Sequence, residues 1–272
     1  MSVQSSGIKV GIKRLARRLV ARGSDLLRHG VEGRLTPGLR ILTYHRVAHD
    51  ARDPFAVKPP EFERQMEAVS RSSSVQRLEQ ALDLLPSDES IPRIALTFDD
   101  GTEDFLTEAL PVLCRFGLPA TLYLSPGKIG TGGFLTWENV REVSRSGVVV
   151  GSHGLDHRSL GLLDAGEAWR QIHDSKAQLE DYLGLPVRTL AYPFGTPRDF
   201  SSRVKEQVQR AGYRAACSSV NGVNHASSDP FELRRTKIEG GDGDIFGKIL
   251  SGGLDCWALV DLHLTFLQNR YA

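Results

Sequence analysis

The chain has 272 residues, of which 40% are hydrophobic and 25% are charged, and its formal net charge is +1 at pH 7. This composition is ordinary for a globular protein, and the length allows one α/β domain with a full core without requiring a second. Residues 1–40 hold nine Lys or Arg against Asp25 and Glu32, a local charge of +7, so the remainder carries about −6. An acidic remainder argues against a nucleic-acid-binding protein.

Residues 1–36 are expected to form a basic amphipathic segment ahead of the main domain. Its apolar residues recur at helical spacing: Ile8, Ile12, Leu15, Leu19 and Leu26. Basic residues lie between them: Lys13, Arg14, Arg17 and Arg18. Two interpretations stay open. We favour a helix that packs its apolar stripe on the domain and leaves its charges in solvent. In the alternative, residues 8–28 make a peripheral contact with an anionic membrane.

No run of about 18 apolar residues occurs, so no membrane-spanning helix is expected. The N-terminus also lacks the continuous apolar core of a signal peptide. A cytoplasmic location, or a peripheral one at the inner membrane face, is therefore favoured. The cysteines Cys114, Cys217 and Cys256 are widely spaced. They are interpreted as small buried apolar residues, which favours a reducing compartment. No feature indicates the oligomeric state.

From residue 40 onward, short apolar runs alternate with helical patterns. The predicted strands are residues 41–44, 94–98, 120–124, 147–151, 188–192, 213–217 and 233–238. The predicted helices are residues 61–69, 103–116, 137–145, 165–183 and 200–211. Such alternation predicts a parallel sheet with helices outside it. Seven strands suit an α/β fold of the incomplete (β/α)7 barrel type, similar to the triosephosphate isomerase barrel. We expect one catalytic domain over residues 37–250, followed by a tail over residues 251–272.

Two of the predicted strands end in groups that bind metals. Asp99 and Asp100 follow the apolar run 94–98, and His153 and His157 follow the run 148–152. A carboxylate with two imidazoles is a ligand set for a divalent metal that keeps an open water position. The second carboxylate is then free to act as a base. Either half alone has an ordinary structural explanation, but the combination indicates metal-assisted hydrolysis.

The barrel interpretation places these groups at one rim, because the C-terminal ends of barrel strands meet there. His45, which ends the run 41–44, and Tyr192, which ends the run 188–192, reach the same rim. Consecutive strand residues point to opposite faces. Asp99 and Asp100 can therefore share a site only if the strand ends at Phe98 and Gly101 permits a tight turn.

These motifs resemble those of the carbohydrate esterase family 4 polysaccharide deacetylases, which share the NodB-homology domain. Residues 97–101 (TFDDG) match the family's first motif, and His153 and His157 match its second, with Gly154 where Ser or Thr is usual. Residues 192–195 (YPFG) match the third. The resemblance implies that Asp99 is the base and that Asp100, His153 and His157 bind one divalent metal, with zinc as the expected ion. It also implies that the backbone N–H of Phe194 helps to hold the oxyanion.

The residue that protonates the leaving amine has two candidates. Most family members use a histidine near the C-terminus, which His263 matches loosely. The run 42–47 (LTYHRV) resembles instead the opening of the biofilm poly-N-acetylglucosamine deacetylases, whose motif order is permuted. That resemblance assigns the acid to His45, which we favour because His45 closes a predicted strand and His263 lies beyond the last one.

The third motif departs from the family pattern, because Ala191 stands where an arginine usually tunes the base. Arg234 or Arg235 could substitute, although we favour ordinary surface or salt-bridged arginines; Arg188 should face away. Trp137 is expected either to stack on a sugar ring or to pack as a core residue at a helix start.

The sequence therefore predicts a metal-dependent hydrolase that removes N-acetyl groups from N-acetylated amino-sugar glycans, whether polysaccharide, oligosaccharide or lipid-linked. One alternative is a hydrolase of small non-peptide amides on a related barrel. Another is a non-catalytic glycan-binding relative. The intact set of two aspartates and two histidines argues against the latter, and only Ala191 favours it.

Overall fold

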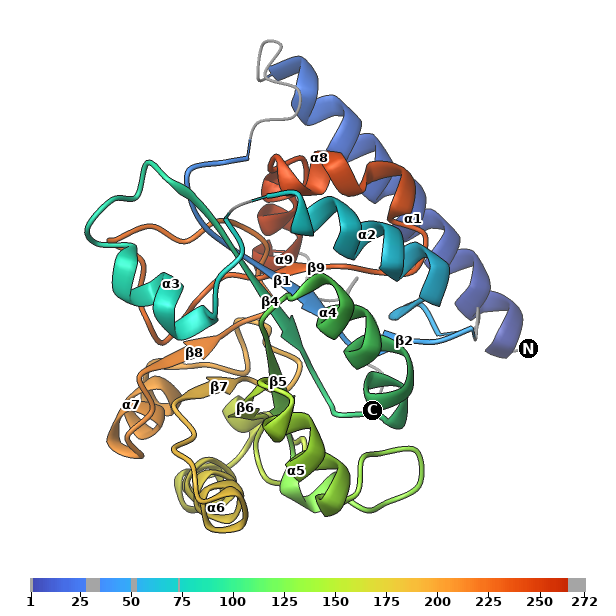
Figure 1. The fold of residues 1–272 in the computed structure, drawn as a ribbon. Coiled ribbons are helices and arrows are strands. Elements are labelled where there is room, and N and C mark those ends of the chain that lie inside the picture. Colours follow the sequence, from blue (N-terminus) through green and yellow to red (C-terminus); the bar gives the residue numbers. More distant parts are fainter. Residues whose placement is uncertain (1, 28–34, 50–52, 73, 264–272) are drawn as a thin grey trace.

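The computed structural model describes residues 2–27, 35–49, 53–72 and 74–263. Seven parallel strands form one curled sheet in the order β8-β7-β6-β5-β4-β1-β9. In chain order they are β1 Gly38–Tyr44, β4 Pro92–Phe98, β5 Ala120–Leu124, β6 Val149–Ser152, β7 Thr189–Ala191, β8 Ala215–Cys217 and β9 Thr236–Lys237. The short strands β2 Arg46–Val47 and β3 Ala56–Val57 pair separately. The predicted incomplete barrel is confirmed, although β7, β8 and β9 are shorter than predicted (Figure 1).

The two edges of the curled sheet meet at a parallel bridge between Cys217 and Leu233. Strand β8 therefore lies next to the segment that leads into β9, at a seam between the first and last members of the strand order. This seam brings residues of β9 to the same barrel interior as those of β4 and β6.

The predicted helices are present in the layer outside the sheet: α2 Pro59–Ser70, α4 Leu110–Phe116, α5 Trp137–Arg145, α6 Ala165–Leu183 and α7 Ser202–Arg210. The predicted helix at 103–116 begins as a π-helical turn, Phe105–Ala109. Local signals set the helix ends. Thr136 and Asn139 form a capping box at the start of α5, and Gly184 ends α6 with φ 66°.

Three α-helices among the described residues were not predicted: α3 Leu78–Leu84, α8 Phe246–Leu250 and α9 Ala258–His263. Each is seven residues or shorter, which leaves too few turns for a clear period. Short 3-10 turns occupy Pro126–Lys128, Leu160–Leu162, Gly243–Ile245 and Asp255–Trp257.

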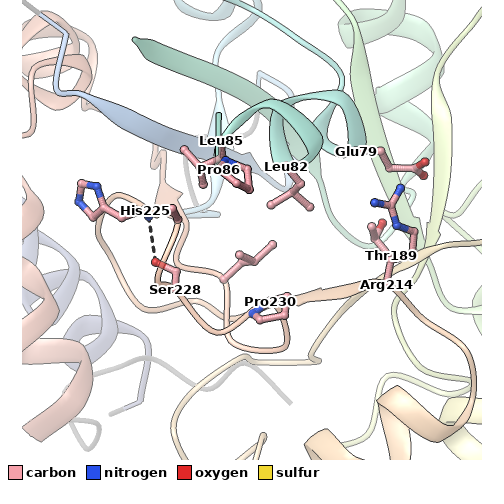
Figure 2. Close-up of a pocket in the computed structure, with 11 residues that line it drawn as sticks. Glu79, Leu82, Leu85, Pro86, Thr189, Arg214, His225, Ser228 and Pro230 are labelled. Carbon is pink, nitrogen blue, oxygen red and sulfur yellow. Dashed lines mark hydrogen bonds between the residues drawn. The ribbon is translucent and has the colours of Figure 1, made fainter. Parts of the chain in front are cut away.

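Helix α3 lies across the N-terminal end of the barrel. Its Leu78 and Ala81 pack with Leu39 and Ile41 in the interior core. Beside it is a cavity of about 230 Å³, lined by Leu82 and the strand-start residues Thr189 and Arg214 among others (Figure 2). This cavity is at the end of the barrel opposite the C-terminal strand ends, where the functional groups were predicted.

The N-terminal helix α1 (Ser2–Leu27) lies beside α8 (Figure 1), but its orientation is the reverse of the one we favoured. Ile12, Leu15 and Leu19 are 64%, 59% and 62% exposed, whereas Arg17 is 1% exposed. Arg17 donates to both carboxylate oxygens of Asp242, at 3.2 and 2.6 Å. The packing-stripe interpretation was therefore wrong for these residues, because complementary acids bury the basic face.

Membrane contact through residues 8–28 stays a prediction, and part of that range lies outside the described residues. Within the described part of the chain, no helix combines the length and the apolar character needed to cross a bilayer. Of the cysteines, Cys217 is buried as predicted, whereas Cys114 and Cys256 are exposed.

Candidate active site

The inward-facing positions of the strands alternate along each strand and end at the barrel mouth. One hydrogen bond beyond β1 and β4 extends their ladder, from the N–H of Asp99 to the carbonyl of Tyr44. A similar bond runs from the N–H of His153 to the carbonyl of Leu124. Asp99 and His153 therefore continue the strand geometry at the rim, and both side chains are nearly fully buried.

The turn after Phe98 resolves how two consecutive carboxylates share one site. Asp100 and Gly101 both have φ 73°, in the left-handed region. A Cβ on Gly101 would lie 2.2 Å from a methyl carbon of Leu124, so this turn has no room for a side chain there. The left-handed backbone conformation of Asp100 directs its carboxylate to the same side as that of Asp99.

Asp100, His153 and His157 form a compact group whose ligand atoms all lie within 4.8 Å of one another. The Nε2 atoms of His153 and His157 lie 3.6 Å and 3.3 Å, respectively, from Oδ1 of Asp100. The Nδ1 of His153 lies 2.7 Å from the carbonyl oxygen of Ala191, so Nδ1–H donates there and the Nε2 lone pair faces Asp100. One carboxylate and two imidazoles aimed at one point fit a divalent metal with an open position.

Electrostatics favour the metal-binding protonation states of His153 and Asp100. Burial lowers the pKa of His153 to about 4, which keeps its imidazole neutral. Burial alone would raise the pKa of Asp100, but the hydrogen bond from His157 and the proximity of His45 outweigh it and hold the pKa well below its usual range. Neutral imidazoles and an ionised carboxylate are the forms that coordinate metals.

Asp99 is held by Arg235. The guanidinium donates from Nη1 to Oδ1 at 2.7 Å and from Nη2 to Oδ2 at 2.8 Å, while its Nε–H donates to the carbonyl of Ser218. Both side chains are buried. Burial would raise the pKa of Asp99, yet the charge of Arg235 outweighs it and lowers that pKa. The carboxylate therefore stays ionised inside the barrel.

Arg235 thus makes a buried two-point contact with Asp99, so the preference for an ordinary surface or salt-bridged arginine is wrong at this position. Its neighbour Arg234 is exposed, and Arg188 pairs with Glu79 at the surface. The alternation of side chains along a strand could have indicated this contact from the sequence. In the predicted strand 233–238, it places Leu233, Arg235 and Lys237 on one face, which packs inward.

His45 lies at the same rim, with Nε2 3.9 Å from Oδ2 of Asp99. Its ring stacks on Phe55, with centroids 5.0 Å apart. Burial lowers the pKa of His45. Among the described residues, none bonds to its buried Nδ1 atom. His263, the alternative acid, is exposed at the end of α9.

The third motif, residues 192–195, packs against the metal-ligand group. Phe194 has φ 62°, and its ring lies 5.0 Å from that of His157. The hydroxyl of Tyr192 donates to the carbonyl of Phe231 at 2.8 Å, so this buried side chain has a packing role. Trp137 lies in the outer layer, 4.6 Å from the ring of Tyr182 between α5 and α6. That position matches the packing alternative rather than sugar stacking.

Comparisons with known proteins agree with this geometry. Residues 87–216 match the family model described as polysaccharide deacetylase. YxkH of Bacillus subtilis, which carries a provisional polysaccharide deacetylase name, is 25% identical over 213 residues, covering 77% of this chain and 75% of its own. The peptidoglycan-N-acetylglucosamine deacetylase PgdA of Listeria monocytogenes is 29% identical over 125 residues, which cover 46% of this chain but only 25% of that protein.

Two solved structures share the fold. IcaB from Ammonifex degensii has a TM-score of 0.70 at 24% identity, with 80% of this chain and 99% of that chain covered. The Streptococcus pyogenes deacetylase PplD, in complex with acetate, has a TM-score of 0.69 at 23% identity, with 75% and 94% covered. The segment that matches the family model, residues 87–216, contains the Asp-Asp and His-His motifs, so this part of the chain is similar in sequence to the polysaccharide deacetylase family, and the described domain shares the fold of these two structures.

Proposed function

We propose that the protein is a metal-dependent hydrolase that removes N-acetyl groups from N-acetylated amino-sugar glycans. The observation that carries the proposal is the meeting of an arginine-held carboxylate, Asp99, with the ligand group Asp100, His153 and His157 and with His45. A binding module has no use for an ionised base next to three metal ligands. Metal identity and the roles of individual residues are part of this proposal.

Asp100, His153 and His157 would hold a divalent metal, with zinc as the expected ion, which would acidify a water and polarise the acetyl carbonyl. Asp99, kept ionised by Arg235, accepts a proton from the attacking water. The backbone N–H of Phe194 is assigned to the developing oxyanion. His45 gives a proton to the nitrogen when the C–N bond breaks, and acetate and a free amino sugar leave.

The contact of Arg235 with Asp99 argues against the non-catalytic alternative. Ala191 was the feature that favoured a binding relative, and the bidentate contact of Arg235 with Asp99 supplies an arginine from the segment that leads into β9. Hydrolysis of small amides remains the second candidate, since the ligand group itself does not select a sugar.

The deciding measurement is acetate release from defined N-acetylglucosamine oligomers by the zinc-loaded protein, with small linear and cyclic amides assayed in parallel. We expect acetate from the oligomers, abolished by a chelator and restored by metal. Turnover of the small amides alone would favour the second candidate. Binding of oligomers without any acetate release would favour the non-catalytic relative.

A further inference from the structure

The ring of His45 lies at the barrel mouth without the hydrogen bond that usually orients a catalytic histidine. Such a histidine is normally held through the ring nitrogen that faces away from the substrate. The buried Nδ1 atom of His45 has no bonding partner within the described ranges. What holds the ring is its stack on Phe55 and the short strand β2, which begins at the next residue. These two segments therefore decide where its Nε2 atom lies.

A single arginine contacts both of these supports. Arg46 is the residue after His45, and its Nε and Nη2 atoms both lie 2.8 Å from Oδ2 of Asp104. Its Nη1 atom lies 3.6 Å from Oδ2 of Asp53. Asp53 belongs to the turn that presents Phe55, because its Oδ1 atom accepts a hydrogen bond from the Phe55 N–H at 2.9 Å. Arg46 thus joins the turn of the stacking ring to a second carboxylate.

Asp104 ties the same arginine to the turn after β4, which presents Asp99. Its Oδ2 atom accepts from Arg46, whereas its Oδ1 atom accepts from the hydroxyl of Thr102 at 2.9 Å and from the N–H of Val47 at 3.3 Å. The Asp104 side chain is 12% exposed, so solvent screens its contact with the guanidinium less than it screens a surface pair. One carboxylate thus fixes the strand after the proposed acid against the turn of the proposed base.

We propose that Arg46 is a positioning residue, which fixes the imidazole of His45 at its place beside Asp99. The inference rests on the proposed function, because it takes His45 as the group that protonates the departing nitrogen. It deepens that function by naming the contacts that set the 3.9 Å between Nε2 of His45 and Oδ2 of Asp99. A displacement of about 1 Å in such a group can cost about 10²-fold in rate.

The test compares two acetyl substrates that differ in their need for an acid. The amine that leaves an N-acetylglucosamine oligomer must be protonated, whereas para-nitrophenolate leaves para-nitrophenyl acetate as a stable anion. Arg46→Met should therefore lower acetate release from the oligomer by about 10²-fold. Hydrolysis of the ester and the content of bound metal should stay close to wild type. A variant that had only lost its fold or its metal would lose both activities together.

Asp104→Asn breaks the same contact with almost no change of shape. The amide keeps one oxygen for Thr102 and Val47 but offers no second acceptor to the guanidinium, so this variant should lose the oligomer activity selectively as well. The double variant should lose no more than Arg46→Met alone, because both substitutions remove one shared contact. Arg46→Lys keeps the charge without the planar fork and should recover part of the rate.

Arg115→Met is the matched control. Arg115 of α4 pairs with Glu63 of α2, so it also joins two elements through an ion pair, but in the outer helix layer. The control should hydrolyse both substrates at the wild-type rate. An equal, selective loss of the oligomer activity in this control would overturn the specific role of Arg46. A near wild-type oligomer rate in Arg46→Met, or an equal loss of both activities there, would overturn it too.

Crystal structures of the wild type and of Arg46→Met test the placement without any catalysis. We expect the variant to lose the stack between His45 and Phe55, whose ring centroids lie 5.0 Å apart in the intact protein. An unmoved His45 ring would reject the positioning role, even if the wild type releases acetate. The proposed function is judged by the wild type alone: no acetate from the oligomers would reject the hydrolase, and the two structures would still decide whether Arg46 holds His45.

Discussion

Asp99 and Arg235 form a two-point ion pair across the barrel interior, although 136 positions separate them in the chain. The pair is buried, and the Nε–H of the guanidinium donates to the carbonyl of Ser218. Such a fork holds a carboxylate in one orientation as well as in one charge state. Arg235 is therefore a positioning residue for the proposed base.

Replacing Arg235 should therefore impair both activity and stability. Arg235→Met is expected to lower acetate release by about 10²-fold, because the base loses its orientation. It should also destabilise the fold by about 3–5 kcal/mol, since a buried carboxylate is left unpaired. Arg234→Met, at the exposed neighbouring position, should change neither quantity. Wild-type turnover in Arg235→Met would remove Arg235 from the mechanism.

Asp99→Asn tests the base directly. The variant should keep stoichiometric metal and lose about 10²–10⁴ in rate, which is typical for the removal of a general base. Metal content by elemental analysis and acetate release are measured on the same preparation. Loss of metal together with activity would mean that the two aspartates have exchanged roles. Near wild-type turnover would make Asp99 structural.

The ligand group should bind metal only when complete. His153→Ala and His157→Ala are each expected to lower bound metal well below one equivalent, because each removes one of three protein ligands. His173→Ala, an exposed histidine on α6, is the control and should bind as much metal as the wild type. Full occupancy in both ligand variants would contradict the assignment.

His45 and His263 separate the two candidate acids. His45→Ala should reduce acetate release by about 10²–10⁴-fold without loss of metal, because His45 is near Asp99 but outside the ligand group. His263→Ala should remain close to wild type, since that side chain is exposed at the end of α9. The reverse outcome would move the acid to the C-terminal histidine.

Acid should loosen the contact between α1 and the domain. Burial alone would raise the pKa of Glu239, but the charges of Arg17 and Lys13 outweigh it and bring that pKa to about 2, from an ordinary 4.5. The unfolded state then binds the proton first, so this group stabilises the fold above pH 4.5 and loses its contribution as the pH falls toward 2.

The contribution that Glu239 loses in acid is on the order of 3 kcal/mol. Glu239→Gln should therefore unfold with a shallower pH dependence between pH 4.5 and pH 2, followed by thermal melts. Asp244→Asn serves as the control, because its contacts with Arg18 and Arg22 are half-exposed and should contribute little. Identical pH profiles for Glu239→Gln and the wild type would reject the buried role.

The sequence was sufficient for the parts of the fold that depend on local pattern. Alternating apolar runs and helical periods predicted the seven strands and the long helices, and strand ends identified Asp99, Asp100, His153 and His45. Patterns of this kind follow from which face of an element is buried. Helix α3 was not predicted from the sequence, because seven residues carry too little periodicity to distinguish a helix from a loop.

Features that depend on a partner far along the chain could not be read in the same way. The stripe of Ile12, Leu15 and Leu19 predicted a buried apolar face, but Asp242 and Glu239 bind the opposite face of α1. Periodicity shows that a helix has two faces and does not show which one meets complementary charge. The contact between Arg235 and Asp99 has the same character, since only closure of the sheet joins them.

The seam between Cys217 and Leu233 has a consequence for which parts of the chain can contact Asp99. Because the strands stand in a circle, Arg235, just before β9, and Ala191, at the end of β7, lie on either side of β8. Arg235 therefore holds Asp99 while Ala191 on β7 offers no charged side chain. Which side chains reach the centre of this barrel thus depends on the angular position of each strand as well as on its order in the chain.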